Sequence, residues 1–298
     1  MEKTQINILC KDGFVLAGTL YKPDLVKGAI MIAPATGIKR VFYNSFASYL
    51  AEHNYGVICF DNRGIGDSVN HSIKDVNASL IDWGSLDMPA VLEKLQELFP
   101  SVSYHLIGHS AGGQLAGLMS NAKDISSMFN FASSSGSLSN MHYPFKLQAY
   151  LFLNIFIPLN NLLFGYTKTH WLGMGEPLPK KVAYQWQKWC NGKGYVAMDF
   201  EQDIQRHLYN ELKIPSQWLY ATDDPIANYE NVQDMLKVYP MIMSEVIALD
   251  PKKLGYKDIG HMKFFSSKYK KLWSYALNWL DKNCLISKAT HINSECNI

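Results

Sequence analysis

One stretch decides the fold: Gly108-His109-Ser110-Ala111-Gly112-Gly113. An apolar run precedes it at residues 104–107, and a helical-looking run follows it at residues 114–119. Strand, tight turn and helix, in that order, are the context in which a G-x-S-x-G pattern holds a serine hydroxyl above a sheet edge. Gly108 and Gly112 have no Cβ, so that strand and helix can approach closely. The alternative is a glycine-rich turn with an incidental serine, and the rest of the chain decides between the two.

Length and composition favour one large α/β domain with an insertion, because the chain has 298 residues of which 48% are hydrophobic. The formal net charge of +2, without a long lysine or arginine run, indicates no nucleic-acid partner. Five cysteines without paired spacing argue against a disulfide framework and against a zinc site. The first residues lack the apolar segment of a signal peptide, so we expect a cytoplasmic location.

One stretch, residues 149–164, could be mistaken for a membrane span. It is interrupted by Asn154, Pro158, Asn160 and Asn161, and it is shorter than the roughly 20 residues that a spanning helix needs. We therefore predict a buried or interfacial lid helix and no transmembrane segment.

Apolar runs alternate with helical patterns through most of the chain. Residues 6–10 and 14–21 read as a hairpin joined by Lys11-Asp12-Gly13. The remaining expected strands are residues 28–33, 56–60, 104–107, 128–132, 215–221 and 245–249. The expected helices are residues 42–54, 82–99, 228–239 and 264–283, with Pro89 in the second of them marking a kink or a first turn. This alternation predicts an α/β fold with a mostly parallel central sheet flanked by helices.

The alternation stops in the middle of the chain, where residues 138–212 are rich in aromatic side chains. We interpret this segment as an inserted, mainly helical cap. The core would then consist of residues 1–137 and 213–285, with a flexible tail at residues 286–298.

A serine nucleophile needs a base, and the base needs an orienting carboxylate. Two aspartates, Asp223 and Asp224, follow the expected strand at residues 215–221, at the carboxyl end where an open α/β sheet places its chemistry. We favour Asp224 as the acid because it directly precedes a proline in the loop; either could serve, the other being a turn-former bonded to its own backbone. His261, after a glycine and ahead of the closing helix, is the candidate base. The alternative for it is a loop histidine packed beneath the site.

The negative oxygen of a tetrahedral intermediate needs two amide donors. One is expected at Ala111, the residue after Ser110, and the other at Thr36 or Gly37 in the loop after the strand at residues 28–33. His109 shapes the turn more plausibly than it carries protons. No histidine pair has metal-ligand spacing, and no metal or organic cofactor is implied.

With these residues in place, the sequence resembles an α/β-hydrolase of the serine-hydrolase type. The order serine, aspartate, histidine is the order of that fold, and residues 61–68, Asp-Asn-Arg-Gly-Ile-Gly-Asp-Ser, resemble a turn that many members carry. It is most similar to predicted bacterial hydrolases of the lysophospholipase and serine-aminopeptidase-like group. One departure is that the usual His-Gly after the third strand is replaced by Ala35-Thr36 or Thr36-Gly37, which leaves the second oxyanion donor open.

The resemblance implies hydrolysis of an ester-type bond through an acyl-enzyme. The aromatic cap favours a small to medium apolar substrate, although its aromatic side chains could instead pack only the cap's own core. Amide or peptide cleavage is a second hypothesis, and it would need a cap carboxylate for a free amine; Glu176, Asp199, Glu201 and Asp203 are available. A third hypothesis is a binding protein that keeps the fold without catalysis. The sequence leaves the physiological substrate and the oligomeric state open.

Overall fold

The computed structural model describes residues 1–69 and 72–295. Eight strands form one sheet in the spatial order β1-β2-β4-β3-β5-β6-β9-β10. They are β1 (Glu2–Leu9), β2 (Val15–Lys22), β3 (Gly28–Ala33), β4 (Tyr55–Phe60), β5 (Ser103–His109), β6 (Ser127–Phe131), β9 (Pro215–Ala221) and β10 (Met243–Leu249). The pairs β1–β2 and β2–β4 are antiparallel, and from β4 to β10 neighbouring strands are parallel. The carboxyl ends of these parallel strands meet at one edge, where loops can gather a site.

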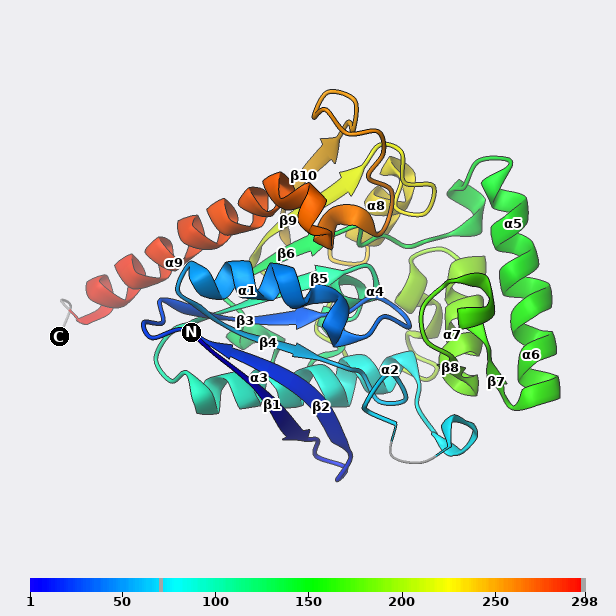
Figure 1. The fold of residues 1–298 in the computed structure, drawn as a ribbon, viewed down its shortest axis with the longest axis horizontal. Coiled ribbons are helices and arrows are strands. Elements are labelled where there is room, and N and C mark those ends of the chain that lie inside the picture. Colours follow the sequence, from blue (N-terminus) through cyan, green and yellow to red (C-terminus); the bar gives the residue numbers. More distant parts are fainter. Residues whose placement is uncertain (70–71, 296–298) are drawn as a thin grey trace.

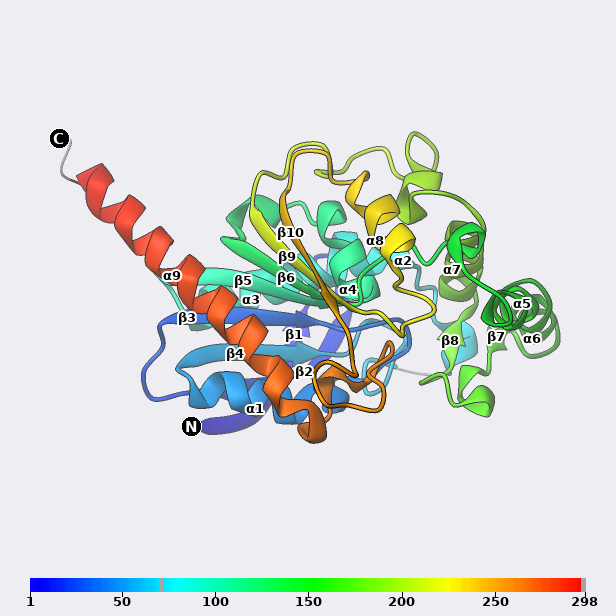
Figure 2. The same ribbon diagram turned by 90° about the horizontal axis from the view of Figure 1, so that it is seen from above.

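Helices flank the sheet (Figures 1 and 2). The helices of the described residues are α1 (Asn44–Glu52), α2 (Leu80–Asp82), α3 (Met88–Leu98), α4 (Ala111–Gln114), α5 (Phe145–Leu151), α6 (Ile157–Phe164), α7 (Lys180–Asn191), α8 (Tyr229–Leu236) and α9 (Trp273–Glu295), of which α5, α6 and α7 lie beyond the sheet. Phe46 and Tyr49 of α1 pack against Trp273 at the start of α9. This architecture matches the expected mostly parallel sheet with helices around it.

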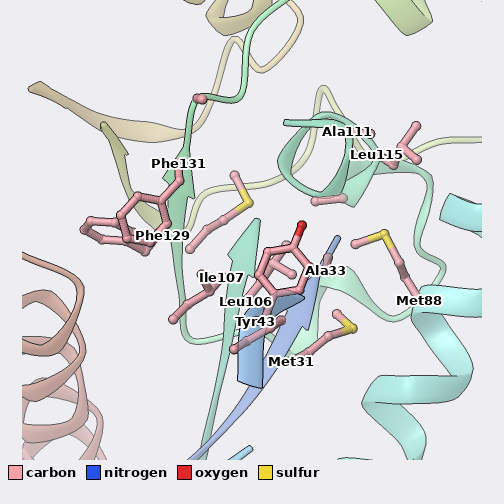
Figure 3. Packing of buried hydrophobic residues seen from close by; sticks show 14 of the residues in the cluster. Met31, Ala33, Tyr43, Met88, Leu106, Ile107, Ala111, Leu115, Phe129 and Phe131 are labelled. Atoms are coloured by element: carbon pink, nitrogen blue, oxygen red, sulfur yellow. The ribbon is translucent and has the colours of Figure 1, made fainter. Parts of the chain in front are cut away.

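The central strands are buried on both faces, and every residue of β3, β4 and β6 is buried. Parallel strands covered on both faces are typically continuous apolar runs, which explains why these three strands were recognisable in the sequence. Figure 3 shows Met31 of β3, Ile107 of β5 and Phe129 of β6 in this core, with Ala111 above them at the start of α4.

The two predicted helices nearest the site differ in detail from the structure. Pro89 stands in the first turn of α3, directly after a π-helical turn, η3 (Trp83–Asp87). The helical run expected at residues 114–119 is wrong: α4 ends at Gln114, and a short 3-10 turn, η4 (Ala116–Leu118), follows. The hydroxyl of Tyr209 donates to the carbonyl of Gln114, and that of Tyr239 donates to the carbonyl of Gly113, so side chains replace the next helical turn.

The closing helix is longer than expected. The backbone of α9 runs from Trp273 to Glu295, whereas the sequence predicted a helix over residues 264–283; the predicted first part forms 3-10 turns instead, at Lys263–Phe265 and Ser267–Leu272. The predicted flexibility of residues 286–298 stays a prediction, and its last part, residues 296–298, lies outside the described residues.

Residues 138–212, here called the cap segment, contribute no strand to the main sheet. Besides α5, α6 and α7 they form a small antiparallel hairpin, β7 (Tyr166–Thr167) and β8 (Leu178–Pro179), which the sequence did not predict. A π-helical turn, η7 (Phe152–Phe156), joins α5 to α6. Figures 1 and 2 place α5 and α6 at the outer end of the molecule, remote from the C-terminal end of α9.

The predicted lid helix forms, but the expectation that it is too short and interrupted is wrong. A single helix runs from Phe145 to Phe164, 20 residues with a mean hydropathy of 1.4, and by length and composition it could cross a membrane. Pro158 does not break it, because the proline falls in the first turn of α6 just after the wider π-helical turn. Only 28% of its most apolar window is buried, so it is not the core helix of the domain.

Candidate active site

Ser110 stands in a strained backbone conformation at the carboxyl end of β5. Its φ is 49° and its ψ is −113°, a combination that is costly for a residue with a Cβ. The serine amide donates to the carbonyl of Phe131 at the end of β6, and the serine carbonyl accepts from the amides of Gly113 and Gln114. These bonds on both sides hold the turn, and they are what the G-x-S-x-G pattern predicted for a strand-to-helix elbow.

The glycines of the elbow are required by close approach. A Cβ on Gly112 would lie 2.1 Å from the carbonyl oxygen of Ala33, at the end of β3. A Cβ on Gly108 would lie 2.4 Å from the amide nitrogen of Gly113. Both distances are far below a normal contact, so the turn can close against its neighbours only with glycine at these positions.

Asp224 and His261 meet at the same edge of the sheet, although 36 residues separate them in the sequence. His261 Nδ1 lies 2.7 Å from Asp224 Oδ2, and the aspartate side chain is fully buried. The other oxygen, Oδ1, accepts from the amides of Ile226 and Ala227. Burial acts to raise the pKa of Asp224, but the charge and the hydrogen bond of His261, with these two amides, hold that pKa below its usual value.

Asp224 is therefore an ionised acceptor for the Nδ1–H of His261, which leaves Nε2 of the imidazole as the basic nitrogen. Among the described residues, no hydrogen bond joins the Ser110 hydroxyl to this ring. Such bonds are often long in unliganded enzymes and shorten when substrate binds.

Asp223 has a different function from the one expected of the second aspartate. Its carboxylate accepts from the amides of Ile259 at 2.9 Å and Gly260 at 3.0 Å. It thus anchors the loop that carries His261, rather than turning back on its own backbone. The two neighbouring aspartates therefore have different roles. Asp224 orients the imidazole of His261, and Asp223 binds the loop that carries it.

His109 connects three parts of the site that are distant in the sequence. The hydroxyl of Tyr43 accepts from the amide of Ala35 and lies 2.8 Å from His109 Nδ1, to which it can donate. The other ring nitrogen, Nε2, lies 3.0 Å from the carbonyl oxygen of His261 and donates to it. Burial, assisted by the charge of His261, lowers the pKa of His109 to about 3, so the ring is neutral. The structure thus gives His109 a bridging role, in line with the expectation that it shapes the turn.

The amides expected to act as oxyanion donors, those of Ala111, Thr36 and Gly37, make no hydrogen bond within the described part of the chain. The loop after β3 is held in place from both ends: Ala35 bonds to Tyr43, and the carbonyl of Gly37 accepts from the amide of Glu176 at 2.7 Å. The cap segment therefore contacts the loop directly, and Thr36 and Gly37 both remain candidates for the second donor.

The turn at residues 61–68 holds the end of the loop that follows β3. Asp61 is fully buried, accepts from the amide of Arg40 at 2.6 Å and forms an ion pair with the guanidinium of the same residue. Arg63 lies 2.6 Å from Asp87 in a second buried pair. Because Arg40 directly follows the loop of residues 34–39, its pair with Asp61 fixes where that loop ends.

Comparison with known families decides what kind of protein carries this site. A model of the family described as serine aminopeptidase, S33, matches residues 24–242. The chain belongs to this family. The matched region includes Ser110 and Asp224 and ends before His261.

Among curated proteins, this S33 family member is 30% identical over 96 residues to protein phosphatase methylesterase 1 of Candida albicans. The matched residues are 32% of the chain and 25% of that protein, so the chain spans about a quarter of the length of this curated relative.

Several solved structures are similar to this S33 family member over almost its whole length. A soluble variant of monoglyceride lipase from Saccharomyces cerevisiae, in complex with a substrate analogue, superposes with a TM-score of 0.67 at 14% identity, covering 94% of this chain and 96% of that one. An α/β hydrolase from a Penicillium species gives 0.59 at 15%, covering 96% and 100%. An esterase of Pyrococcus furiosus gives 0.59 at 17%, covering 94% and 92%. At these identities the likeness shows the fold, and the α/β-hydrolase fold is confirmed.

Sequence reasoning missed two residues that organise the site. Tyr43 was not singled out, because a lone tyrosine at the start of a helix carries no local signal of a buried bridge. Asp223 was considered only as a rival of Asp224, since the sequence does not show which of two adjacent carboxylates points towards a loop 36 residues away.

Proposed function

We propose that this α/β-hydrolase is a serine hydrolase that cleaves an ester-type bond, with Ser110 as nucleophile, His261 as base and Asp224 as the orienting acid. The observation that carries the proposal is the 2.7 Å contact between His261 Nδ1 and Asp224 Oδ2, at the sheet edge where the strained elbow presents Ser110. A buried carboxylate that fixes one nitrogen of an imidazole leaves the other poised to accept a proton.

In the proposed reaction, the Ser110 oxygen attacks the ester carbonyl while Nε2 of His261 takes the hydroxyl proton. The negative charge that forms on the carbonyl oxygen is stabilised by the Ala111 amide and by the amide of Thr36 or Gly37. The imidazolium gives its proton to the departing alcohol, which leaves an acyl group on the serine. Water, deprotonated by the same histidine, then releases the acid and restores the serine.

The decisive experiment is labelling with a fluorophosphonate probe, which reacts with activated serines. The native protein should be labelled, and Ser110→Ala should not be. Ser139→Ala is a matched control, because Ser139 is exposed in a neighbouring loop outside the proposed triad. Labelling that persists in Ser110→Ala would refute the assignment of the nucleophile, and a native protein that is never labelled would favour a binding protein without catalysis.

The substrate is proposed to carry a small to medium apolar acyl or alkyl group. This substrate proposal is supported by the contact between the aromatic-rich cap segment and the loop after β3 that contains Thr36 and Gly37. Glu176 and Leu178 of the cap segment make this contact. Rates on p-nitrophenyl esters should rise from acetate to longer chains. A profile that is flat or falls beyond acetate would contradict an apolar acyl site.

Amide or peptide cleavage is the second candidate, favoured by the description of the family as serine aminopeptidases. Of the four carboxylates considered for a substrate amine, Asp199 is fully buried and bonded to Lys188 and Trp189, so it is not available. Glu176 is half-buried next to Gly37 and paired with Lys39 at 3.0 Å, which makes it the best placed.

Comparing aminoacyl p-nitroanilides with p-nitrophenyl esters separates the two candidates. If the enzyme is an aminopeptidase, Glu176→Gln should raise KM for the anilides and leave ester turnover nearly unchanged. If esters are hydrolysed and anilides are not, the amide hypothesis is excluded.

A further inference from the structure

The helix from Phe145 to Phe164, here called the cap helix, presents apolar side chains to the outside of the molecule. Residues at four-residue intervals are each about half exposed or more: Leu147, Leu151, Ile155, Leu159 and Leu163. This spacing places them along one face of the helix. Three of them, Leu151, Ile155 and Leu159, border a shallow groove of about 450 Å³ on the cap that contains none of the proposed catalytic residues.

Two polar side chains near the end of the same helix face the protein, whereas Gln148 near its start is exposed. Asn160 and Asn161 are buried: Asn160 accepts from the amide of Lys168, and Asn161 accepts from the hydroxyl of Thr167 and donates to the carbonyl of Lys180. A surface helix of a globular protein normally turns its polar side outward. The second half of the cap helix shows the opposite arrangement, with its asparagines buried and its leucines exposed.

The charge around this face is strongly positive. Between Asp124 and Asp199 the sequence contains six lysines and a single acidic residue, Glu176, which is already paired with Lys39. Within the described part of the chain, the four lysines nearest the cap helix have no ion-pair partner: Lys146, Lys168, Lys180 and Lys181. Over the whole cap segment, residues 138–212, seven basic residues stand against five acidic ones, so the excess of positive charge lies in the part before Asp199, which contains the cap helix.

Aromatic side chains accompany these lysines at the end of the helix. The ammonium group of Lys168 lies 3.5 Å from the ring centroid of Phe164 and 4.2 Å from that of Trp171, and Trp171 is 58% exposed. Aromatic rings with lysines at the border of an apolar surface are typical of segments that lie at a membrane–water interface.

We propose that the cap helix docks on an anionic lipid bilayer surface, with its leucine face in the interface and the flanking lysines on lipid phosphates. The exposed apolar face supplies the insertion, and the unpaired lysines supply charge complementarity. A second copy of the chain fits this face less well, because two cap helices packed against each other would bring like-charged lysines together. The proposal does not depend on the ester chemistry proposed above.

Flotation of the full-length protein with vesicles tests the proposal, with vesicles of phosphatidylcholine alone and of phosphatidylcholine with phosphatidylglycerol. We expect the wild type to float with the anionic vesicles and to bind the neutral ones at least about tenfold more weakly. Leu159→Glu/Leu163→Glu should lower binding to the anionic vesicles at least about tenfold. Leu25→Glu is the matched control, because Leu25 is 75% exposed in the loop between β2 and β3; it should bind as the wild type does.

A second pair of variants tests whether the lysines contribute to binding of the anionic vesicles. Lys180→Glu/Lys181→Glu should weaken binding to the anionic vesicles about tenfold or more, and Lys270→Glu/Lys271→Glu, two adjacent exposed lysines outside the cap segment, should change it little. Circular dichroism melting checks that each variant folds.

Three results would overturn the proposal. The first is a wild type that stays with the unbound fraction for both vesicle types. The second is equal binding of wild type, cap variants and controls, or equal binding to neutral and anionic vesicles. The third is a dimer in sedimentation velocity that Leu159→Glu/Leu163→Glu dissociates while no vesicle binding occurs, since the face would then belong to a second copy.

Discussion

His109, the buried histidine next to Ser110, can be tested quantitatively, because its protonation should make the unfolding free energy depend on pH. Replacing it, His109→Gln, removes a ring that bonds to the hydroxyl of Tyr43 and to the carbonyl of His261. Leaving these two buried groups poorly satisfied should cost roughly 2–4 kcal/mol of unfolding free energy at pH 7. The structure predicts that this cost becomes smaller in acid.

The reason is proton linkage. An unfolded histidine binds a proton below about pH 6.5, whereas the folded His109, with its pKa lowered to about 3 by burial and by the charge of His261, stays neutral. The unfolded wild type therefore binds more protons between these values, so its stability falls as the pH falls through this window. From pH 7 to pH 4.5 the wild type should lose about 2.5 kcal/mol through this group, a loss that the glutamine variant does not share.

Urea unfolding of both proteins at pH 7 and pH 4.5 measures the effect, through the difference in unfolding free energy at each pH. That difference should shrink by about 2.5 kcal/mol at pH 4.5. A difference that stays constant or grows in acid would refute the view that burial keeps His109 neutral.

A matched control is His105→Gln. His105 is also buried, its pKa is lowered to about 4 by burial, and it bonds to Ser127 in the interior of the sheet. The His105→Gln variant should show a similar dependence of unfolding free energy on pH. It should keep hydrolytic activity, because His105 contacts neither His261 nor Tyr43. If both variants lose activity equally, the loss reflects general destabilisation rather than the bridge.

Three further predictions concern the proposed site and the turn beneath it. Gly112→Ala should lower the unfolding free energy by about 3 kcal/mol or more, because its methyl group would lie 2.1 Å from the carbonyl oxygen at the end of β3; a thermal melt within a degree of the wild type would contradict this. Asp224→Asn should reduce kcat about 10⁴-fold, because the amide can no longer hold His261 in the required tautomer, and a loss under tenfold in ester assays would remove Asp224 from the proposed triad. Arg63→Met should destabilise the fold by about 1–3 kcal/mol, since the fully buried Asp87, whose pKa burial raises to about 7, loses its hydrogen-bond partner; an unfolding free energy equal to that of the wild type in chemical denaturation would contradict this.

The sequence by itself determined the architecture and the elbow. The buried strands β3 and β4 are continuous apolar runs, and the Gly108–Gly113 turn between strand and helix is a local pattern. Both signals are local, since burial on two faces and close packing at a turn restrict which residues a short stretch can contain. The order of serine, aspartate and histidine along the chain is equally visible without coordinates.

Only the tertiary structure decided which side chains meet. Adjacent Asp223 and Asp224 have the same local pattern, and the path of the loop after β10 decides that one holds that loop and the other holds His261. The bridge from Tyr43 through His109 likewise joins segments 66 residues apart. The outward leucines of the cap helix follow the same rule, because a helical pattern shows which residues share a face, but the packing of the neighbouring α7 and β7 decides which face remains in water.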